Sequence, residues 1–140
     1  MLTECIYHAD LTRVLARKKF YVENGTQYYD VFLWETKDAL QRDYECRKGK
    51  CSDSVLGVTC PAPYKDGTMP DFLGEIHFAA PSWNMEVVAH ECLHATLHAL
   101  RVHEIDLLDG NMDDEERICY LHGRLFEDVY RWLWSMREFR

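Results

Sequence analysis

The chain has 140 residues, of which 47% are hydrophobic and 13% aromatic, so it can bury the core of one globular domain spanning residues 1–140. Its formal net charge of -8 argues against duplex DNA or an anionic membrane as a partner, because both reward basic surfaces. No apolar stretch is long enough to span a bilayer and no signal peptide is recognised, so the expected compartment is the cytosol.

The first third of the chain predicts one strand and one short helix. Residues 5–19 mix apolar and basic side chains, and their apolar spacing is weakly typical of a helix. After a turn at Gly25, residues 28–34 place Tyr, Val and Leu in alternation with Asp, Phe and Trp, which predicts a strand. Thr36 is then expected to cap a helix from residue 37 to about 44.

The remainder of the chain predicts two further strands and two helices. Residues 54–60 and 72–79 are rich in apolar residues and are separated by a loop that contains prolines and glycine. Ser82 or Asn84 can cap the helix that follows, and a last helix runs to about Arg137. This order of elements predicts an α+β fold in which a small mixed sheet packs on the last two helices.

The first of these two helices carries the pattern H-E-x-x-H at His90, Glu91 and His94. Two histidines four residues apart are separated by about 6 Å along a helix, so both imidazoles can reach one tetrahedral Zn²⁺. Glu91 lies beside them, where it can act as a general base on a water molecule. The other interpretation is a core helix whose histidines are satisfied by hydrogen bonds.

Residues 87–100 contain no ionisable side chains other than Glu91, the histidines and the Cys92 thiol, so this helix is expected to be buried nearly all round. A buried carboxylate between two histidines is costly unless a charge compensates it, and a divalent cation does so directly. His98 lies about 12 Å from His90 along the helix, so these two cannot share an ion, and His98 is expected in the core.

The last helix supplies acidic residues at positions 113–116, and the two helices together resemble the gluzincin metallopeptidases. The compact size is similar to that of minigluzincins and phage-encoded zincin-like proteins. The resemblance covers about residues 74–134 and implies a zincin-like fold, a bound Zn²⁺ and a glutamate of the last helix as third zinc ligand. The first half of the chain contains no motif of the family.

Two glutamates compete for that third position. In gluzincins the ligand precedes a small residue two turns later, on the face packed against the H-E-x-x-H helix, and Gly123 takes this place if the ligand is Glu116. Helical periodicity instead centres the apolar face of the last helix nearer Glu115. We take Glu116 as the expected ligand and Glu115 as the alternative, with Tyr120 as a hydrogen-bonding partner near the first histidine.

The resemblance implies a zinc-dependent metallopeptidase that hydrolyses peptide bonds, with Glu91 as general base, His90, His94 and Glu116 as metal ligands, and a peptide or protein as substrate. It also places an extended peptide along the strand before the metal helix, so residues 74–80 are expected to form a sheet edge. His98, His122 and Tyr130 are unranked candidates for stabilising the transition state.

Two other functions fit the sequence. A non-enzymatic zincin-like interaction or inhibitor protein, such as a phage-encoded anti-defence factor acting in the host cytosol, fits the small size and the acidity. A structural zinc site in a thiol protein rests on the six cysteines. Of these, Cys92 and Cys119 are expected to be buried small apolar residues, and Cys46, Cys51 and Cys60 to be free thiols rather than a disulfide or a second zinc site.

Overall fold

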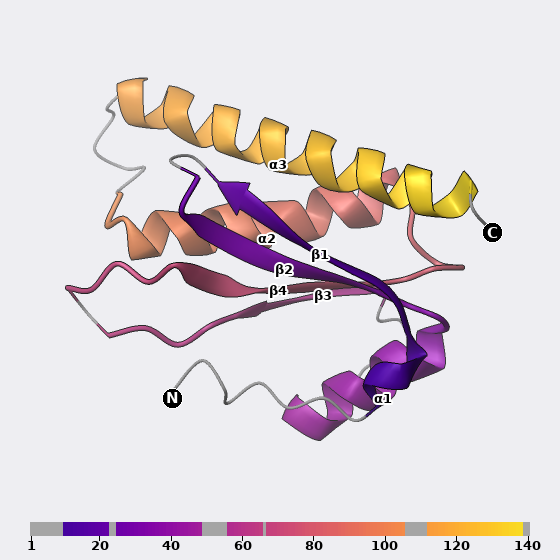
Figure 1. The fold of residues 1–140 in the computed structure, drawn as a ribbon. Coiled ribbons are helices and arrows are strands. Elements are labelled where there is room, and N and C mark those ends of the chain that lie inside the picture. Colours follow the sequence, from indigo (N-terminus) through magenta and orange to yellow (C-terminus); the bar gives the residue numbers. More distant parts are fainter. Residues whose placement is uncertain (1–9, 23–24, 49–55, 66, 106–111, 139–140) are drawn as a thin grey trace.

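A four-stranded sheet with helices on both faces forms the protein in the computed structural model, which describes residues 10–22, 25–48, 56–65, 67–105 and 112–138 (Figure 1). The elements in chain order are a 3-10 helix Leu11–Arg13, β1 Val14–Val22, β2 Gln27–Trp34, α1 Lys37–Lys48, β3 Gly57–Pro61, β4 Phe72–Ala79, α2 Met85–Val102 and α3 Met112–Glu138. The prediction of an α+β fold with a small mixed sheet is confirmed.

The strands lie in the order β1-β2-β4-β3. β1 pairs antiparallel with β2, β2 pairs parallel with β4, and β4 pairs antiparallel with β3. β4 therefore lies inside the sheet, and the expectation that residues 74–80 form its edge is wrong. The reason is that β3, although earlier in the chain, pairs with the outer side of β4 and itself becomes the edge.

The close pairing of β3 with β4 depends on Gly74. Its φ of +145° lies outside the range that residues with a side chain commonly adopt. A Cβ placed there would also lie 2.4 Å from the carbonyl oxygen of Cys60 on β3. Glycine thus allows the two backbones to approach each other at the end of the ladder, where Gly74 is opposite Pro61.

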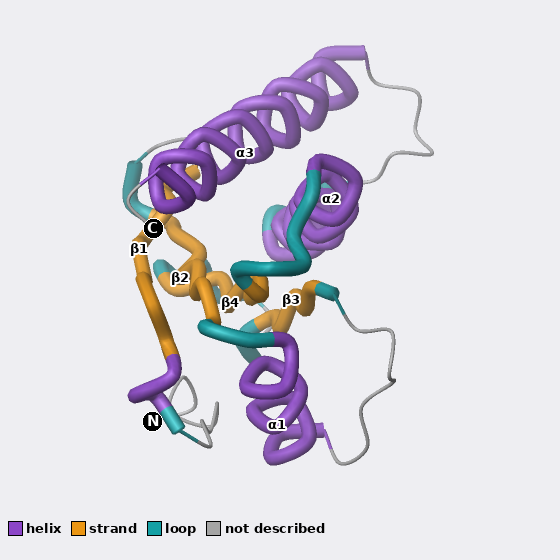
Figure 2. Tube along the Cα trace, turned by 90° about the vertical axis from the view of Figure 1, so that its right-hand side faces the viewer, coloured by secondary structure: helices purple, strands orange, loops and turns teal. Residues whose placement is uncertain are grey.

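The sheet divides the interior into two cores. α2 and α3 cover one face and α1 covers the other (Figure 2). β2 serves both cores because alternate side chains point to opposite faces. Tyr29, Val31 and Leu33 join the larger core under α2 and α3, whereas Phe32 and Trp34 join the smaller core beside α1. The predicted alternation of residues 28–34 is confirmed.

The predicted secondary structure holds for the central elements and fails at the N-terminal end. The strand at residues 72–79 has the predicted bounds, and α1 extends four residues beyond its expected end at residue 44. The strand expected at 54–60 is described as Gly57–Pro61. The weak helical spacing within residues 5–19 was misleading, because residues 14–22 form β1, the longest strand.

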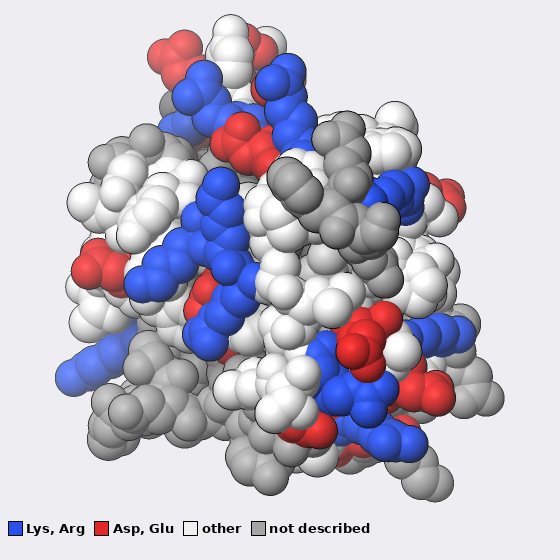
Figure 3. Space-filling view, turned by 45° about the vertical axis from the view of Figure 1, so that its right-hand side comes forward, with Lys and Arg blue, Asp and Glu red and all other residues white. Residues whose placement is uncertain are grey.

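The surface carries both signs of charge. On the face drawn in Figure 3, acidic and basic side chains are interspersed rather than gathered into one field. On β1, for example, Arg17 forms an ion pair of 2.7 Å with Asp30 on β2. None of the helices in the described ranges is long and apolar enough to cross a membrane.

Candidate metal centre

The motif helix α2 begins at a side-chain cap. Asn84 has extended backbone angles, and its side-chain oxygen accepts a hydrogen bond of 2.9 Å from the backbone N–H of Val87. Of the two caps considered from the sequence, Asn84 is thus the one used. The cap fixes where the helix starts. The side chains that α2 turns toward the sheet are apolar and at most 1% exposed: Val88, Cys92, Ala95 and Ala99.

His90 and His94 lie on the opposite side of α2, and both are exposed. Their Nε2 atoms are 3.2 Å apart, and their ring centroids are 4.8 Å apart. Two nitrogens that bind one tetrahedral zinc at 2.0–2.1 Å are separated by roughly 3.3–3.4 Å. The pair therefore fits two corners of a zinc tetrahedron, although the same distance also suits a hydrogen bond from one neutral imidazole to the other.

The expectation that α2 is buried nearly all round is wrong. Besides the two histidines, Leu93 is 46% exposed. α2 contacts β3 and β4 of the sheet on one side and α3 on another, and the side that carries the two histidines faces solvent. The two imidazoles can consequently be reached from outside, which a metal centre that acts on a substrate requires.

Glu91, between the two histidines, turns toward β3 and is only 6% exposed. Its Oε1 accepts a hydrogen bond of 2.6 Å from the hydroxyl of Thr59, which also lies 3.1 Å from the Glu91 carbonyl oxygen. The sequence suggested a cation as the compensation for this buried carboxylate, whereas the structure provides a neutral donor. Thr59 was missed because no pattern links a strand residue to a helix residue 32 positions later.

Glu115 and Glu116 both lie near the start of α3 and are exposed. Among the residues that the structure describes, no group of three His, Cys, Asp or Glu side chains is close enough to hold a metal ion, so neither glutamate joins the histidine pair. Gly123 also does not take the place against α2 that the family pattern requires. Gly123 is exposed with nothing within 4 Å of an added Cβ, so it does not pack against α2.

The orientation of α3 distinguishes the two glutamates. His122 faces α2, because its Nε2 lies 3.4 Å from the carbonyl oxygen of Ala89. At 100° per residue, Glu115 lies about 20° from the direction of His122 around the helix, whereas Glu116 lies about 120° away. Glu115 is therefore on the side of α3 that faces the motif helix, and Glu116 is nearer the outer side.

The other residues considered from the sequence are dispersed. Tyr120 is 71% exposed, and Cys119 is exposed rather than buried as expected. Helical phase explains both positions, since the buried stripe of α3 runs through Leu121, Leu125, Val129 and Leu133. Cys92 is buried, as expected. Cys46 and Cys60 are free thiols, but they lie on α1 and, buried, on β3 rather than on a loop, and Cys51 lies outside the described residues.

His98 lies in the core, as expected, and its ring stands edge-on to Tyr64. Burial lowers the pKa of His98, and the positive charge of Arg101 lowers it further, against a raising contribution from a hydrogen bond to the Leu73 backbone. Its Nε2 is buried without a hydrogen-bond partner among the described residues. His98 is thus held as a neutral imidazole one turn beyond His94.

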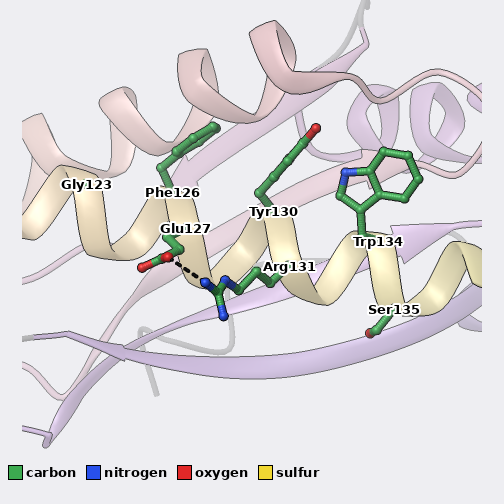
Figure 4. A pocket seen from close by; sticks show the side chains of 7 residues that line it. All are labelled: Gly123, Phe126, Glu127, Tyr130, Arg131, Trp134 and Ser135. Carbon is green, nitrogen blue, oxygen red and sulfur yellow. Dashed lines mark hydrogen bonds and ion pairs between the residues drawn. The ribbon is translucent and has the colours of Figure 1, made fainter.

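A separate hollow of about 620 Å³ runs along α3 (Figure 4). Phe126 and Tyr130 stack at 5.5 Å in it, and Arg131 pairs with Glu127 at 2.9 Å. The lining residues are Gly123, Phe126, Glu127, Tyr130, Arg131, Trp134 and Ser135. None of them belongs to the H-E-x-x-H motif, so this hollow is not part of the candidate metal centre.

Comparisons with models of protein families, with curated proteins and with solved structures found no match. The chemistry of the residues at the candidate metal centre therefore carries the functional argument.

Proposed function

We propose that the protein is a zinc-dependent metallopeptidase of gluzincin type. His90 and His94 would hold the ion, a glutamate from the start of α3 would have to approach them to complete the ligand set, and Glu91 would serve as general base. The observation that carries the proposal is the 3.2 Å separation of the Nε2 atoms of the two exposed histidines. The same helix turn carries Glu91, whose carboxylate is hydrogen-bonded to Thr59. Imidazole nitrogens and carboxylate oxygens are ordinary zinc ligands.

Bound zinc supplies Lewis acidity, which polarises a peptide carbonyl and lowers the pKa of water. The protein's own contribution is Glu91, whose carboxylate takes a proton from the attacking water and returns it to the leaving amine. A site that is only structural has no use for such a group, so Glu91 favours catalysis. The third ligand is Glu116 or Glu115, and the phase of α3 favours Glu115.

A substrate peptide would lie along β3 rather than β4. β3 is one of the two outer strands of the described sheet, and it is the one beside α2, where its Thr59 contacts the general base. An extended peptide can add to a sheet edge through backbone hydrogen bonds, which give affinity with little dependence on sequence. This arrangement would bring a scissile bond past the outer side of α2, where the two imidazoles are exposed.

Metal content tests the proposal. Purified protein, dialysed against zinc and then against buffer, should contain one zinc per chain by elemental analysis, and His94→Ala should contain none. Glu115→Ala and Glu116→Ala identify the third ligand, because only one of them should lose the metal. Cys119→Ser is the matched control, since a thiolate also binds zinc, and it should retain the metal. A wild-type protein without zinc would overturn the proposal.

Cleavage separates an enzyme from an interaction protein. Zinc-loaded wild type should hydrolyse fluorescein-labelled casein, and Glu91→Gln should keep its fold and its zinc while losing cleavage by about 10²-fold or more. If zinc is bound but Glu91→Gln cleaves as fast as wild type, Glu91 is not the base. In that case the non-enzymatic interaction protein becomes the better explanation of the fold.

A further inference from the structure

We infer that Thr59 and Gly57 of β3 form a seat that positions the carboxylate of Glu91. This inference rests on the proposed function and extends it to two residues outside the H-E-x-x-H motif. Thr59 is a positioning residue: it acts through Glu91 and supplies no group to the reaction. Gly57 contributes by having no side chain.

The hydroxyl of Thr59 ties Glu91 to β3 at two atoms. It lies 2.6 Å from Oε1 and 3.1 Å from the backbone carbonyl oxygen of Glu91. The side chain of Glu91 has three rotatable bonds, and ordering such a side chain without a partner costs conformational entropy. A short hydrogen bond to a carboxylate is stronger than one between neutral groups, so it can offset this cost.

Gly57 lies two residues before Thr59, on the same face of the strand. A Cβ built at Gly57 would lie 2.9 Å from Cγ of Glu91 and 3.0 Å from a methyl carbon of Val87. The first distance is shorter than real Cβ contacts and the second is shorter than most of them, so a larger residue at position 57 has to displace the Glu91 side chain or α2. The bare backbone at Gly57 thus lets the stem of Glu91 lie directly against β3.

The two carboxylate oxygens of Glu91 differ in their contacts with β3. Oε1, and not Oε2, accepts the hydrogen bond from the Thr59 hydroxyl. With Oε1 fixed, the carboxylate cannot rotate freely, and Oε2 is the oxygen left to take the proton. Orientation of this kind acts on the rate of proton transfer more than on the binding of substrate.

The contact itself is tested in metal-free protein by urea unfolding. Thr59→Val should lower the urea midpoint in the wild-type background, whereas Thr59→Ser, which keeps the hydroxyl, should restore most of the loss. In a Glu91→Ala background the hydroxyl has lost its carboxylate partner and keeps only the backbone carbonyl of residue 91, so Thr59→Val should lower the midpoint by much less than in wild type. Equal losses in both backgrounds would overturn the inference.

The consequence for catalysis is tested with zinc-loaded variants and fluorescein-labelled casein. Thr59→Val should lower kcat by about 10- to 100-fold, the range expected for a lost hydrogen bond to a charged group, with KM and zinc content unchanged. Thr59→Ser should recover kcat to within about threefold. A Thr59→Val variant with the kcat of wild type would show that Thr59 does not position the base.

Gly57→Ala provides an independent variant. It should lower kcat while keeping zinc, because the added Cβ displaces Glu91 and not the exposed imidazoles. Gly123→Ala is the matched control, since a Cβ at Gly123 meets nothing within 4 Å. Failure of the proposed function looks different: wild type would bind no zinc or cleave nothing, while the coupling between Thr59 and Glu91 in metal-free protein would persist.

Discussion

Trp34 and His77 are joined by a buried hydrogen bond of 2.9 Å between the indole Nε1 and Nδ1 of the imidazole. An indole N–H can only donate, so Nδ1 is the acceptor and the proton of His77 is on Nε2. Nε2 donates to Oε1 of Glu75 at 2.8 Å. His77 is therefore a neutral ring with a fixed tautomer, on the face of the sheet opposite to the candidate metal centre.

Trp34→Phe should destabilise the protein by more than the lost volume explains. The substitution leaves the buried Nδ1 of His77 without its donor, which costs about 1–3 kcal/mol in addition to the packing loss. Urea unfolding measures the difference. Trp83→Phe is the control, because Trp83 is also buried, loses the same atoms, and contacts the rings of Tyr130 and Trp134 rather than a histidine nitrogen. Equal destabilisation by both substitutions would contradict the assigned hydrogen bond.

Asn84→Ala should shorten or destabilise α2. The change removes the acceptor for the backbone N–H of Val87, and loss of such a cap costs about 1 kcal/mol. The free energy of unfolding from urea titration gives the value. Ser82→Ala serves as the comparison, since Ser82 does not cap the helix, and it should change stability by less than about 0.5 kcal/mol.

His98 should make the protein less stable in mild acid. Burial lowers its pKa in the folded state, so below the unfolded-state value of about 6.5 the unfolded chain binds a proton that the folded chain does not. Stability then falls as pH falls through this window, by at most about 1.4 kcal/mol per pH unit. His98→Leu should remove this loss of stability in acid. The free energy of unfolding of the variant minus that of wild type should therefore increase as the pH falls from 7.5 to 5.5. A constant difference across that range would contradict the prediction.

The cysteines should react with iodoacetamide in two groups. Cys46 and Cys119 are exposed and should be alkylated in the native protein, whereas Cys60 and Cys92 are buried and should be protected. Burial, with the charge of Glu91 as a smaller cause, raises the pKa of Cys92 to about 12 and further suppresses its thiolate. Peptide mass spectrometry identifies the labelled residues, with protein unfolded in guanidinium as the fully reactive control. Protection of Cys119 in metal-free protein would contradict its exposed position.

The central strands could be predicted because their side chains alternate and both faces of the sheet are covered. β1 could not, since three consecutive basic residues, Arg17, Lys18 and Lys19, interrupt the apolar pattern. In the structure the charged ends of two of them lie over aromatic rings of the neighbouring strand: Arg17 is 4.6 Å from the ring of Phe32, and Lys19 is 4.7 Å from that of Tyr28. Such contacts between strands have no signature in the order of residues along one strand.

The candidate metal centre could be predicted only where its residues share one helix. The spacing of His90 and His94 fixes their common face through helical geometry alone. The seat of Glu91 on β3 and the phase of α3 both depend on how separate elements pack, and packing between elements is set by the whole core. For the same reason, the exposed side of α2 was not foreseen from its apolar composition.

The strand order also determines when the candidate site can exist during synthesis of the chain. β1 and β2 are neighbours in sequence and in space, so this hairpin can form as soon as residue 34 has been made. β3 is made before β4 but pairs with β4, and α2 follows later still. Thr59 therefore has no sheet to join, and Glu91 no strand to rest on, until the chain has grown past residue 91. The exposed histidine pair is made after the strand beside it, and α3, with Glu115 and Glu116, follows last among the described elements.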